Sequence, residues 1–256
     1  MDTASVEQTD SAGSAVRTAA FVYGAVCYAL FLGTLLYAAG FVCGWFVPRT
    51  IDSGKSDPTQ RALLVNILLL SVFAVQHSVM PRPWFKARWT RIVPKPIERS
   101  TYVLFTCLIL GTLFWQWRTI PSVIWQVDQA FFWWVLTILS ACGWLLVLYS
   151  SFLIDHFELF GLRQVYEFAR NRSIAKPTFV TPRLYRWVRN PLMLGFLIAF
   201  WAAPVMTAGH LLFAIVTTGY IFVGINLEER DNMTMLGDEY RSYRTRTPMI
   251  LPQPPK

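Results

Sequence analysis

Long apolar runs separated by short polar segments dominate the chain. A membrane-spanning helix needs about 20 apolar residues, and several of the runs reach that length. We predict spans over residues 19–47, 62–80, 100–117, 130–154, 192–207 and 211–227. The pattern predicts an all-α, polytopic integral membrane bundle of about six spans, in which the last two, shorter runs could instead form a short helical hairpin.

The polar segments divide the chain further. Residues 1–18 lack the basic start of a signal peptide, and we expect a disordered cytosolic tail there. The longest internal polar segment, residues 155–190, is too short for a second fold. We therefore expect residues 19–256 to form one membrane domain.

Composition and charge support this interpretation. Hydrophobic residues make up 54% of the chain and charged residues 15%, whereas soluble domains carry about 25% charged residues. With about six spans, 19 of the 23 Lys and Arg residues fall on the side of the termini. The positive-inside rule then places both termini in the cytoplasm. The net charge of +8 thus follows from topology, and we do not expect nucleic-acid binding.

The cysteines do not indicate a metal site or a disulfide framework. All four lie inside apolar runs and none forms a CxxC pair: Cys27, Cys43, Cys107 and Cys142. We interpret them as small buried hydrophobic residues.

A basic segment before the fifth run contains the first candidate site. Arg189 and Asn190 precede Pro191, which opens the run, and Gly195 follows one turn later. Proline favours the first turn of a helix, and free N–H groups there attract an anionic group. A cationic anchor at the membrane surface explains the same residues without a ligand.

The end of the sixth run carries two adjacent carboxylates, Glu228 and Glu229. The C-terminal end of a helix favours cations, so these carboxylates indicate a partner, which could be Arg230, Arg189 or a ligand. A solvated helix end with local ion pairs is the alternative. The following segment, 231–246, mixes Met, Leu and Tyr with charged residues, which predicts an amphipathic segment on the bilayer or over a site.

Three further residues are candidates for chemistry. His156 and Arg163 follow the fourth run, near Asp155 and Glu158, but these side chains cannot complete a tetrahedral metal site without distant ligands. His77 lies inside the second run, where an ionisable residue indicates function and an imidazole can accept a proton. A histidine that only makes hydrogen bonds between helices is the alternative.

Several of these motifs occur together in one known superfamily. The segment from Arg189 to Gly195, the apolar hairpin, Glu228–Glu229 and the tyrosines near Tyr240 resemble the C-terminal half of isoprenylcysteine carboxyl methyltransferases and related membrane methyltransferases. The segments at 76–80, 98–102, 155–164 and 209–213 are similar to those of the bacterial methanethiol S-methyltransferase family. The resemblance covers about residues 62–252.

The resemblance implies a cofactor, a reaction and a location. Residues 191–256 would form the S-adenosylmethionine-binding half, facing the cytoplasm from a bacterial inner membrane. The cofactor would be bound by the following residues: Arg189, Asn190, Pro191, Gly195, Glu228, Glu229 and Tyr240. The substrate would be a small thiol, methanethiol or hydrogen sulfide, with His77, Arg163 and His156 as candidate catalytic residues.

Two residues depart from the superfamily pattern. Asn190 stands where His is usual and Met193 where an aromatic is usual, so no protonated ring contacts the cofactor at that position. The alternatives are an isoprenylcysteine- or phospholipid-type methyltransferase, or a non-enzymatic NnrU-like membrane protein. The sequence contains no signal for an oligomeric state.

Overall fold

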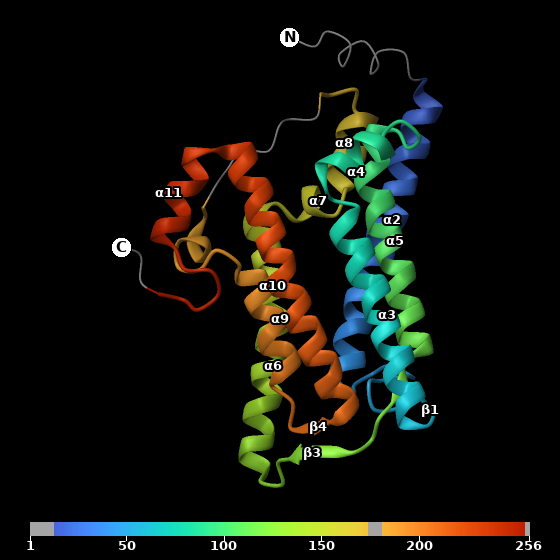
Figure 1. Cartoon of the computed structure of the whole chain (residues 1–256). Coiled ribbons are helices and arrows are strands. Elements are labelled where there is room, and N and C mark those ends of the chain that lie inside the picture. The colour runs from blue at the N-terminus through green and yellow to red at the C-terminus, as the bar shows by residue number, and fades with distance from the viewer. Residues whose placement is uncertain (1–12, 174–180, 254–256) are drawn as a thin grey trace.

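Helices running along one long axis build the protein (Figure 1). The structure is a computed structural model and describes residues 13–173 and 181–253. Within these residues, five helices are long and apolar enough to cross a membrane. They are α2 (Ser14–Cys43), α3 (Thr59–Val79), α5 (Lys95–Gln116), α6 (Ala130–Ile154) and α10 (Ala208–Leu236). The predicted helical membrane architecture is thereby confirmed.

The observed boundaries follow local chain chemistry. Pro58, Pro96 and Pro191 stand at or beside the first residues of α3, α5 and α9, where a missing N–H costs no hydrogen bond. Helix α2 ends at Gly44, whose φ of 77° is a conformation that glycine adopts readily. Helix α2 also begins at Ser14, inside the segment expected to be a tail; residues 1–12 of that tail lie outside the described residues.

The fifth predicted run differs most from expectation. Helix α9 (Pro191–Trp201) has 11 residues, which corresponds to about 16 Å at 1.5 Å per residue. A bilayer core is about 30 Å thick. Within the described residues, one shorter apolar helix, α9, therefore accompanies the five long ones, and the choice between six spans and a short final hairpin stays a prediction.

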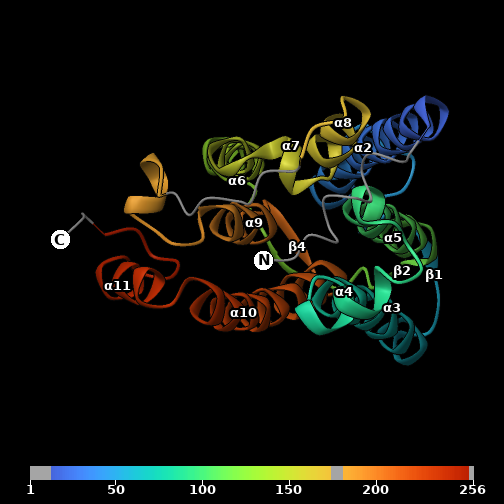
Figure 2. The ribbon, with the colours of Figure 1, turned by 90° about the horizontal axis from the view of Figure 1, so that it is seen from above.

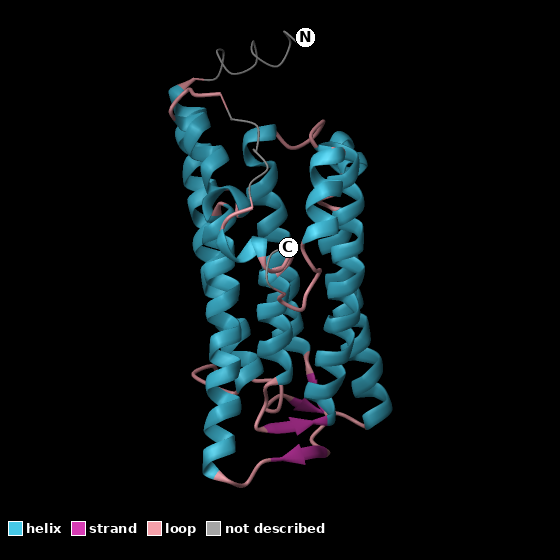
Figure 3. Ribbon diagram, turned by 90° about the vertical axis from the view of Figure 1, so that its left-hand side faces the viewer, coloured by secondary structure: helices cyan, strands magenta, loops and turns pink. Residues whose placement is uncertain are grey.

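Short strands close one end of the bundle. Strand β1 (Lys55–Ser56) pairs in parallel with β2 (Arg118–Thr119), and β3 (Val123–Gln126) pairs antiparallel with β4 (Val205–Thr207). All four lie at the end away from the N-terminus (Figure 3). The fifth apolar run therefore forms a helix over only part of its length. Its last residues, Val205–Thr207, pair with β3 as strand β4 instead of continuing the helix.

Short helices gather toward the other end. They are α4 (Pro83–Trp89), α7 (His156–Leu159), α8 (Leu162–Ala169), the 3-10 helix η1 (Arg183–Arg186) and α11 (Asp238–Arg246). Seen from above, α6, α9, α10 and α11 lie on one side of the bundle and α2, α5 and α8 on the other (Figure 2). Helix α3 contacts both α5 and α10, so it connects the two sides.

An aromatic core joins the long helices. Phe41 of α2 packs against Phe114 of α5, with ring centroids 4.9 Å apart. Phe213 of α10 packs against Phe200 of α9 at 5.1 Å and lies 6.4 Å from Phe41. These buried rings connect α2 and α5 on one side of the bundle with α9 and α10 on the other.

Helices α6 and α9 approach each other closely at two glycines. A Cβ atom on Gly195 would lie 2.7 Å from the carbonyl oxygen of Gly143 and 2.9 Å from the backbone nitrogen of Val147. Small residues permit this approach between membrane helices. The structure therefore places Gly195 against α6, where it sets the position of α9.

Gly195→Ala should destabilise the protein by about 1–3 kcal/mol, because the added methyl group meets backbone atoms that cannot move away independently. Unfolding in detergent micelles measures this loss. Gly111→Ala is the control, since a Cβ there meets nothing within 4 Å. If the two variants were equally stable, the close α6–α9 approach would be contradicted.

Candidate active site

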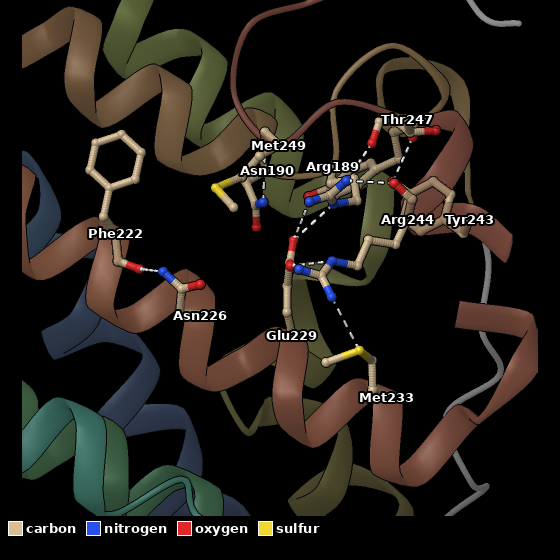
Figure 4. Close-up of polar contacts among 11 residues, drawn as sticks. Arg189, Asn190, Phe222, Asn226, Glu229, Met233, Tyr243, Arg244, Thr247 and Met249 are labelled. Carbon is tan, nitrogen blue, oxygen red and sulfur yellow. Dashed lines mark hydrogen bonds and ion pairs between the residues drawn. The ribbon is translucent and has the colours of Figure 1, made fainter. Parts of the chain in front are cut away.

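A buried ion pair links the start of α9 to the end of α10. Nε and Nη2 of Arg189 lie 2.8 and 2.7 Å from Oε1 of Glu229 (Figure 4). The two side chains are 7% and 4% exposed. Arg189 is thus the partner of Glu229, which was one of the alternatives for the paired carboxylates.

The same arginine holds the C-terminal segment in place. Its Nη1 donates to the carbonyl oxygens of Arg244, at 2.9 Å, and Thr247. The next residue, Asn190, donates from its backbone N and from Nδ2 to the carbonyl oxygen of Met249, both at 3.2 Å. The chain after α11 therefore folds over the first turn of α9, as the amphipathic pattern of residues 231–246 allowed.

One carboxylate oxygen of Glu229 can still accept a hydrogen bond. Its Oε2 lies 3.1 Å from Nε of Arg244, yet this buried atom has no aligned hydrogen bond among the described residues. Helix α11 brings Tyr240 close, and Tyr240 interacts electrostatically with Glu229 and Arg189. Burial raises the pKa of the Tyr240 phenol, so this side chain stays protonated near neutral pH.

Glu228 faces a different set of residues. Its side chain is exposed and makes no hydrogen bond or ion pair with the part of the chain that the structure describes. Arg82 and Arg99 interact with it electrostatically. Arg82 is held by Asp231, with Nη1 and Oδ2 2.6 Å apart, and Arg99 by the carbonyl oxygen of Leu159, at 2.8 Å.

His77 lies in the same region. The hydroxyl oxygen of Tyr102 is 2.8 Å from its Nδ1. Its ring stacks on Phe73 with centroids 5.1 Å apart, and Tyr220 of α10 lies 6.3 Å away. Arg99, which is 5.3 Å from the ring centroid of Tyr102, interacts electrostatically with both His77 and Glu228.

Residues from α3, the segment after it, α5 and α10 thus form one group, which we call the polar cluster. Its members are His77, Arg82, Arg99, Tyr102, Tyr220 and Glu228. The group combines an imidazole, two guanidinium groups and a carboxylate that has no ion-pair partner among the described residues. Such a group can bind a zwitterion and accept a proton.

His156 and Arg163 lie outside this cluster. His156 is buried, with Nε2 2.9 Å from the Tyr28 hydroxyl and Nδ1 2.8 Å from the Ser151 hydroxyl. Burial lowers its pKa, although Asp155 opposes the shift. Arg163, half exposed, pairs with Asp155 and more distantly with Glu158. Neither residue is brought to His77, and their catalytic roles stay predictions.

The remaining predicted residues form a second group. The structure brings Arg189, Asn190, Glu229 and Tyr240 together, and Pro191 is fully buried as the first residue of α9; their roles in cofactor binding stay predictions. Within the described residues no three His, Cys, Asp or Glu side chains could hold a metal ion.

Sequence reasoning missed several residues of the site. In the sequence, membrane topology accounts for Arg82 and Arg99, although Arg99 also lies in the segment 98–102 that carries the family resemblance, and Tyr220 lies inside an apolar run. A signal existed for Tyr220, because it lies eight residues before Glu228 on the same helix and hence on a similar face. No comparable signal pointed to Arg244, whose contact with Glu229 depends on how α11 folds back.

The fold and the site together define a polytopic helical membrane protein with a charged site between its helix ends. Known relatives narrow the class. The chain is 57% identical to methanethiol S-methyltransferase 1 of Bradyrhizobium diazoefficiens, over 91% of this chain and 82% of that protein. It is 54% identical to the methanethiol S-methyltransferase of Mycobacterium tuberculosis, over 93% and 98% of the two chains. A third relative of that name, from Crocosphaera subtropica, is 47% identical over 96% of each chain.

The chain belongs to the methanethiol S-methyltransferase family, and it is therefore a methyltransferase. This confirms the resemblance found in the sequence motifs. No protein-family model and no solved structure matches the chain.

Proposed function

We propose that this protein transfers a methyl group from S-adenosylmethionine to methanethiol, giving dimethyl sulfide. The observation that carries the proposal is Glu228, an exposed carboxylate without an ion-pair partner among the described residues, beside Arg82 and Arg99 and in the same cluster as His77. The substrate follows from the names of the relatives. Hydrogen sulfide is a second acceptor of the same chemistry.

The residues present fit this methyl donor. It carries an amino acid end with both charges, which Glu228 and one of the two arginines can match. It also carries ribose hydroxyls, which suit the unsatisfied Oε2 of Glu229. Tyr240 would cover this part of the site, while Arg189, Asn190, Pro191 and Gly195 hold α9 and the C-terminal segment in position.

When bound, S-adenosylmethionine supplies an electrophilic methyl group on a sulfonium. The attacking group is a thiolate, and a thiol keeps most of its proton near neutral pH because its pKa is about 8.5 or higher. His77 accepts that proton. The Tyr102 hydroxyl lies 2.8 Å from Nδ1 and 3.1 Å from Nε2 of His77, and the ring nitrogen that carries no proton is the basic atom. The positive charge of Arg99 stabilises the thiolate. His156 and Arg163 hold the α7–α8 segment, whose Leu159 carbonyl oxygen accepts a hydrogen bond from Arg99.

We place the site at the cytoplasmic face of a bacterial inner membrane. The support is the excess of Lys and Arg in the segments on the side of the termini. The cofactor then reaches the polar cluster from the cytosol, and a small thiol also reaches it through the lipid.

Purified protein in lipid nanodiscs tests the reaction. Incubation with methyl-labelled S-adenosylmethionine and a panel of thiols, prenylcysteines and amines should give labelled dimethyl sulfide from methanethiol. Calorimetry without a thiol should show cofactor binding. Label transfer only to prenylcysteines or amines would overturn the proposed substrate, and absence of cofactor binding would overturn the proposed donor.

His77→Ala should lower the turnover number by about 10²- to 10⁴-fold near pH 7, the usual contribution of a general base. The defect should narrow as the pH rises toward 9, because more of the thiol then ionises without help. Rates between about pH 6 and pH 9 measure this convergence. A defect that is the same at every pH would indicate a structural role for His77, and wild-type turnover throughout would exclude it as the base.

A further inference from the structure

A cavity lies at the end of the bundle away from the polar cluster, beside the short strands. Its volume is about 130 Å³, and residues of α2, α6, α9 and α10 and of the segments after α2 and α9 line it. Among its lining residues are Cys43, Asp52, Thr137, Ser140, Ala203 and His210. His210 precedes Glu228 by 18 residues on α10, which corresponds to about 27 Å along a helix. The cavity is therefore separate from the polar cluster.

Two lining residues have unused hydrogen-bonding capacity. Thr137 is 5% exposed, and its buried Oγ1 has no hydrogen-bond partner within the described residues. His210 is 3% exposed, and its Nε2 donates to the carbonyl oxygen of Phe200 at 2.9 Å. The neutral ring that makes this bond has Nδ1 as an acceptor, and Nδ1 has no hydrogen bond to any described residue. The cavity thus offers one donor and one acceptor.

Charge and size restrict the occupant. No Lys or Arg lines the cavity, and its one carboxylate, Asp52, accepts a hydrogen bond from Thr207 and interacts with His210. An anion would meet this carboxylate without a compensating cation. A cavity of 130 Å³ is also smaller than the roughly 300–1,000 Å³ of sites for larger ligands. The lining thus disfavours an anion and a large ligand, and a small neutral molecule meets both limits.

We propose that this cavity binds a small neutral organosulfur molecule, either a thiol or its methylated thioether. The Thr137 hydroxyl donates to the sulfur, and the apolar wall at Ala202 and Ala203 contacts the methyl groups. A thiol also donates its S–H to Nδ1 of His210, which a thioether cannot do. The class of ligand rests on the proposed function; the cavity and its two open hydrogen-bonding groups do not.

Protection of Cys43 tests this site. Cys43 lines the cavity and is half-buried. In nanodiscs without S-adenosylmethionine, methyl methanethiosulfonate should label it, and mass spectrometry of its peptide gives the rate. Three non-hydrogen atoms limit the affinity to a dissociation constant on the order of 1 mM. Dimethyl sulfide at about ten times that concentration should therefore slow labelling about tenfold.

Matched variants and a second cysteine separate binding from partitioning into lipid. Cys142 lies within α6 and is exposed on the surface that faces lipid, so dimethyl sulfide bound in the cavity should leave its labelling rate unchanged, whereas dimethyl sulfide that only partitions into lipid should slow both cysteines. Thr137→Val should lose the protection of Cys43, and Thr137→Ser should keep it. Equal slowing of Cys142, unslowed labelling of Cys43, or full protection in Thr137→Val would overturn the proposal and leave water as the occupant.

The imidazole ¹⁵N resonance of His210 Nδ1 distinguishes a bound thiol from a bound thioether. It also tests the site if Cys43 does not react with the label. Methanethiol should shift this resonance upfield, and dimethyl sulfide should leave it nearly unchanged. No shift with methanethiol and no protection with dimethyl sulfide would overturn the site even if methyl transfer is intact. Because neither measurement requires turnover, absence of methyl transfer would contradict only the proposed function.

Discussion

Glu229→Gln is expected to destabilise the protein by about 3–5 kcal/mol, the usual consequence of removing one partner of a buried ion pair. The substitution keeps the size of the side chain but leaves the guanidinium of Arg189, whose side chain is 7% exposed, without its carboxylate. Arg189 also holds the carbonyl oxygens of Arg244 and Thr247. The segment after α11 should therefore loosen before the bundle unfolds, which hydrogen exchange would detect.

Two further variants test whether the unpaired charge of Arg189 causes the loss of stability. Replacing both partners, Arg189→Met with Glu229→Met, should restore part of the stability, because the buried pair of charges is gone while the hydrogen bonds to the carbonyl oxygens of Arg244 and Thr247 are lost. Asp238→Asn breaks the exposed pair with Arg241 and should cost less than about 1 kcal/mol. Unfolding in detergent micelles measures all of these variants. If Glu229→Gln were as stable as Asp238→Asn, the buried pair would not hold the C-terminal segment.

The long helices could be predicted from the sequence because bilayer thickness fixes the length of an apolar run. The observed α6 (Ala130–Ile154) has the expected bounds. The same signal fails where something other than lipid ends a helix. Residues 202–207 are apolar, but β3 pairs with part of them and α9 stops at Trp201. Helix α10 continues through charged residues to Leu236, beyond the apolar run that predicted it.

The candidate residues could be found in the sequence, but their grouping could not. Adjacent positions on an α-helix point about 100° apart, so Glu228 and Glu229 belong to different groups, one with Arg82 and Arg99 and the other with Arg189. Spacing alone does not show which residues face them from other helices. The sequence places His156 beside Asp155 and Glu158, whereas its contacts with Tyr28 and Ser151 depend on how α7 turns back against α2.

Glu228→Gln should weaken binding of S-adenosylmethionine by about 10- to 100-fold, which corresponds to the roughly 1.5–3 kcal/mol of a hydrogen bond to a charged group. Folding should be unaffected, because Glu228 is exposed and has no ion pair with any residue in 13–173 or 181–253. Calorimetry with the cofactor and thermal unfolding without it measure the two quantities. Glu228→Gln should therefore lose binding without losing stability, whereas Glu229→Gln should lose stability through its broken ion pair with Arg189.

The two arginines determine which ligand should lose more affinity in Glu228→Gln. Removing the charge of Glu228 leaves Arg82 and Arg99 without an opposing carboxylate, apart from the Asp231 that pairs with Arg82. The polar cluster then becomes more positive, which weakens its hold on the ammonium and sulfonium of the methyl donor. The product S-adenosylhomocysteine lacks the sulfonium charge, so its affinity should fall less than that of S-adenosylmethionine. Equal losses for the two ligands would show that Glu228 recognises only the groups they share, and no loss for either would remove Glu228 from the site.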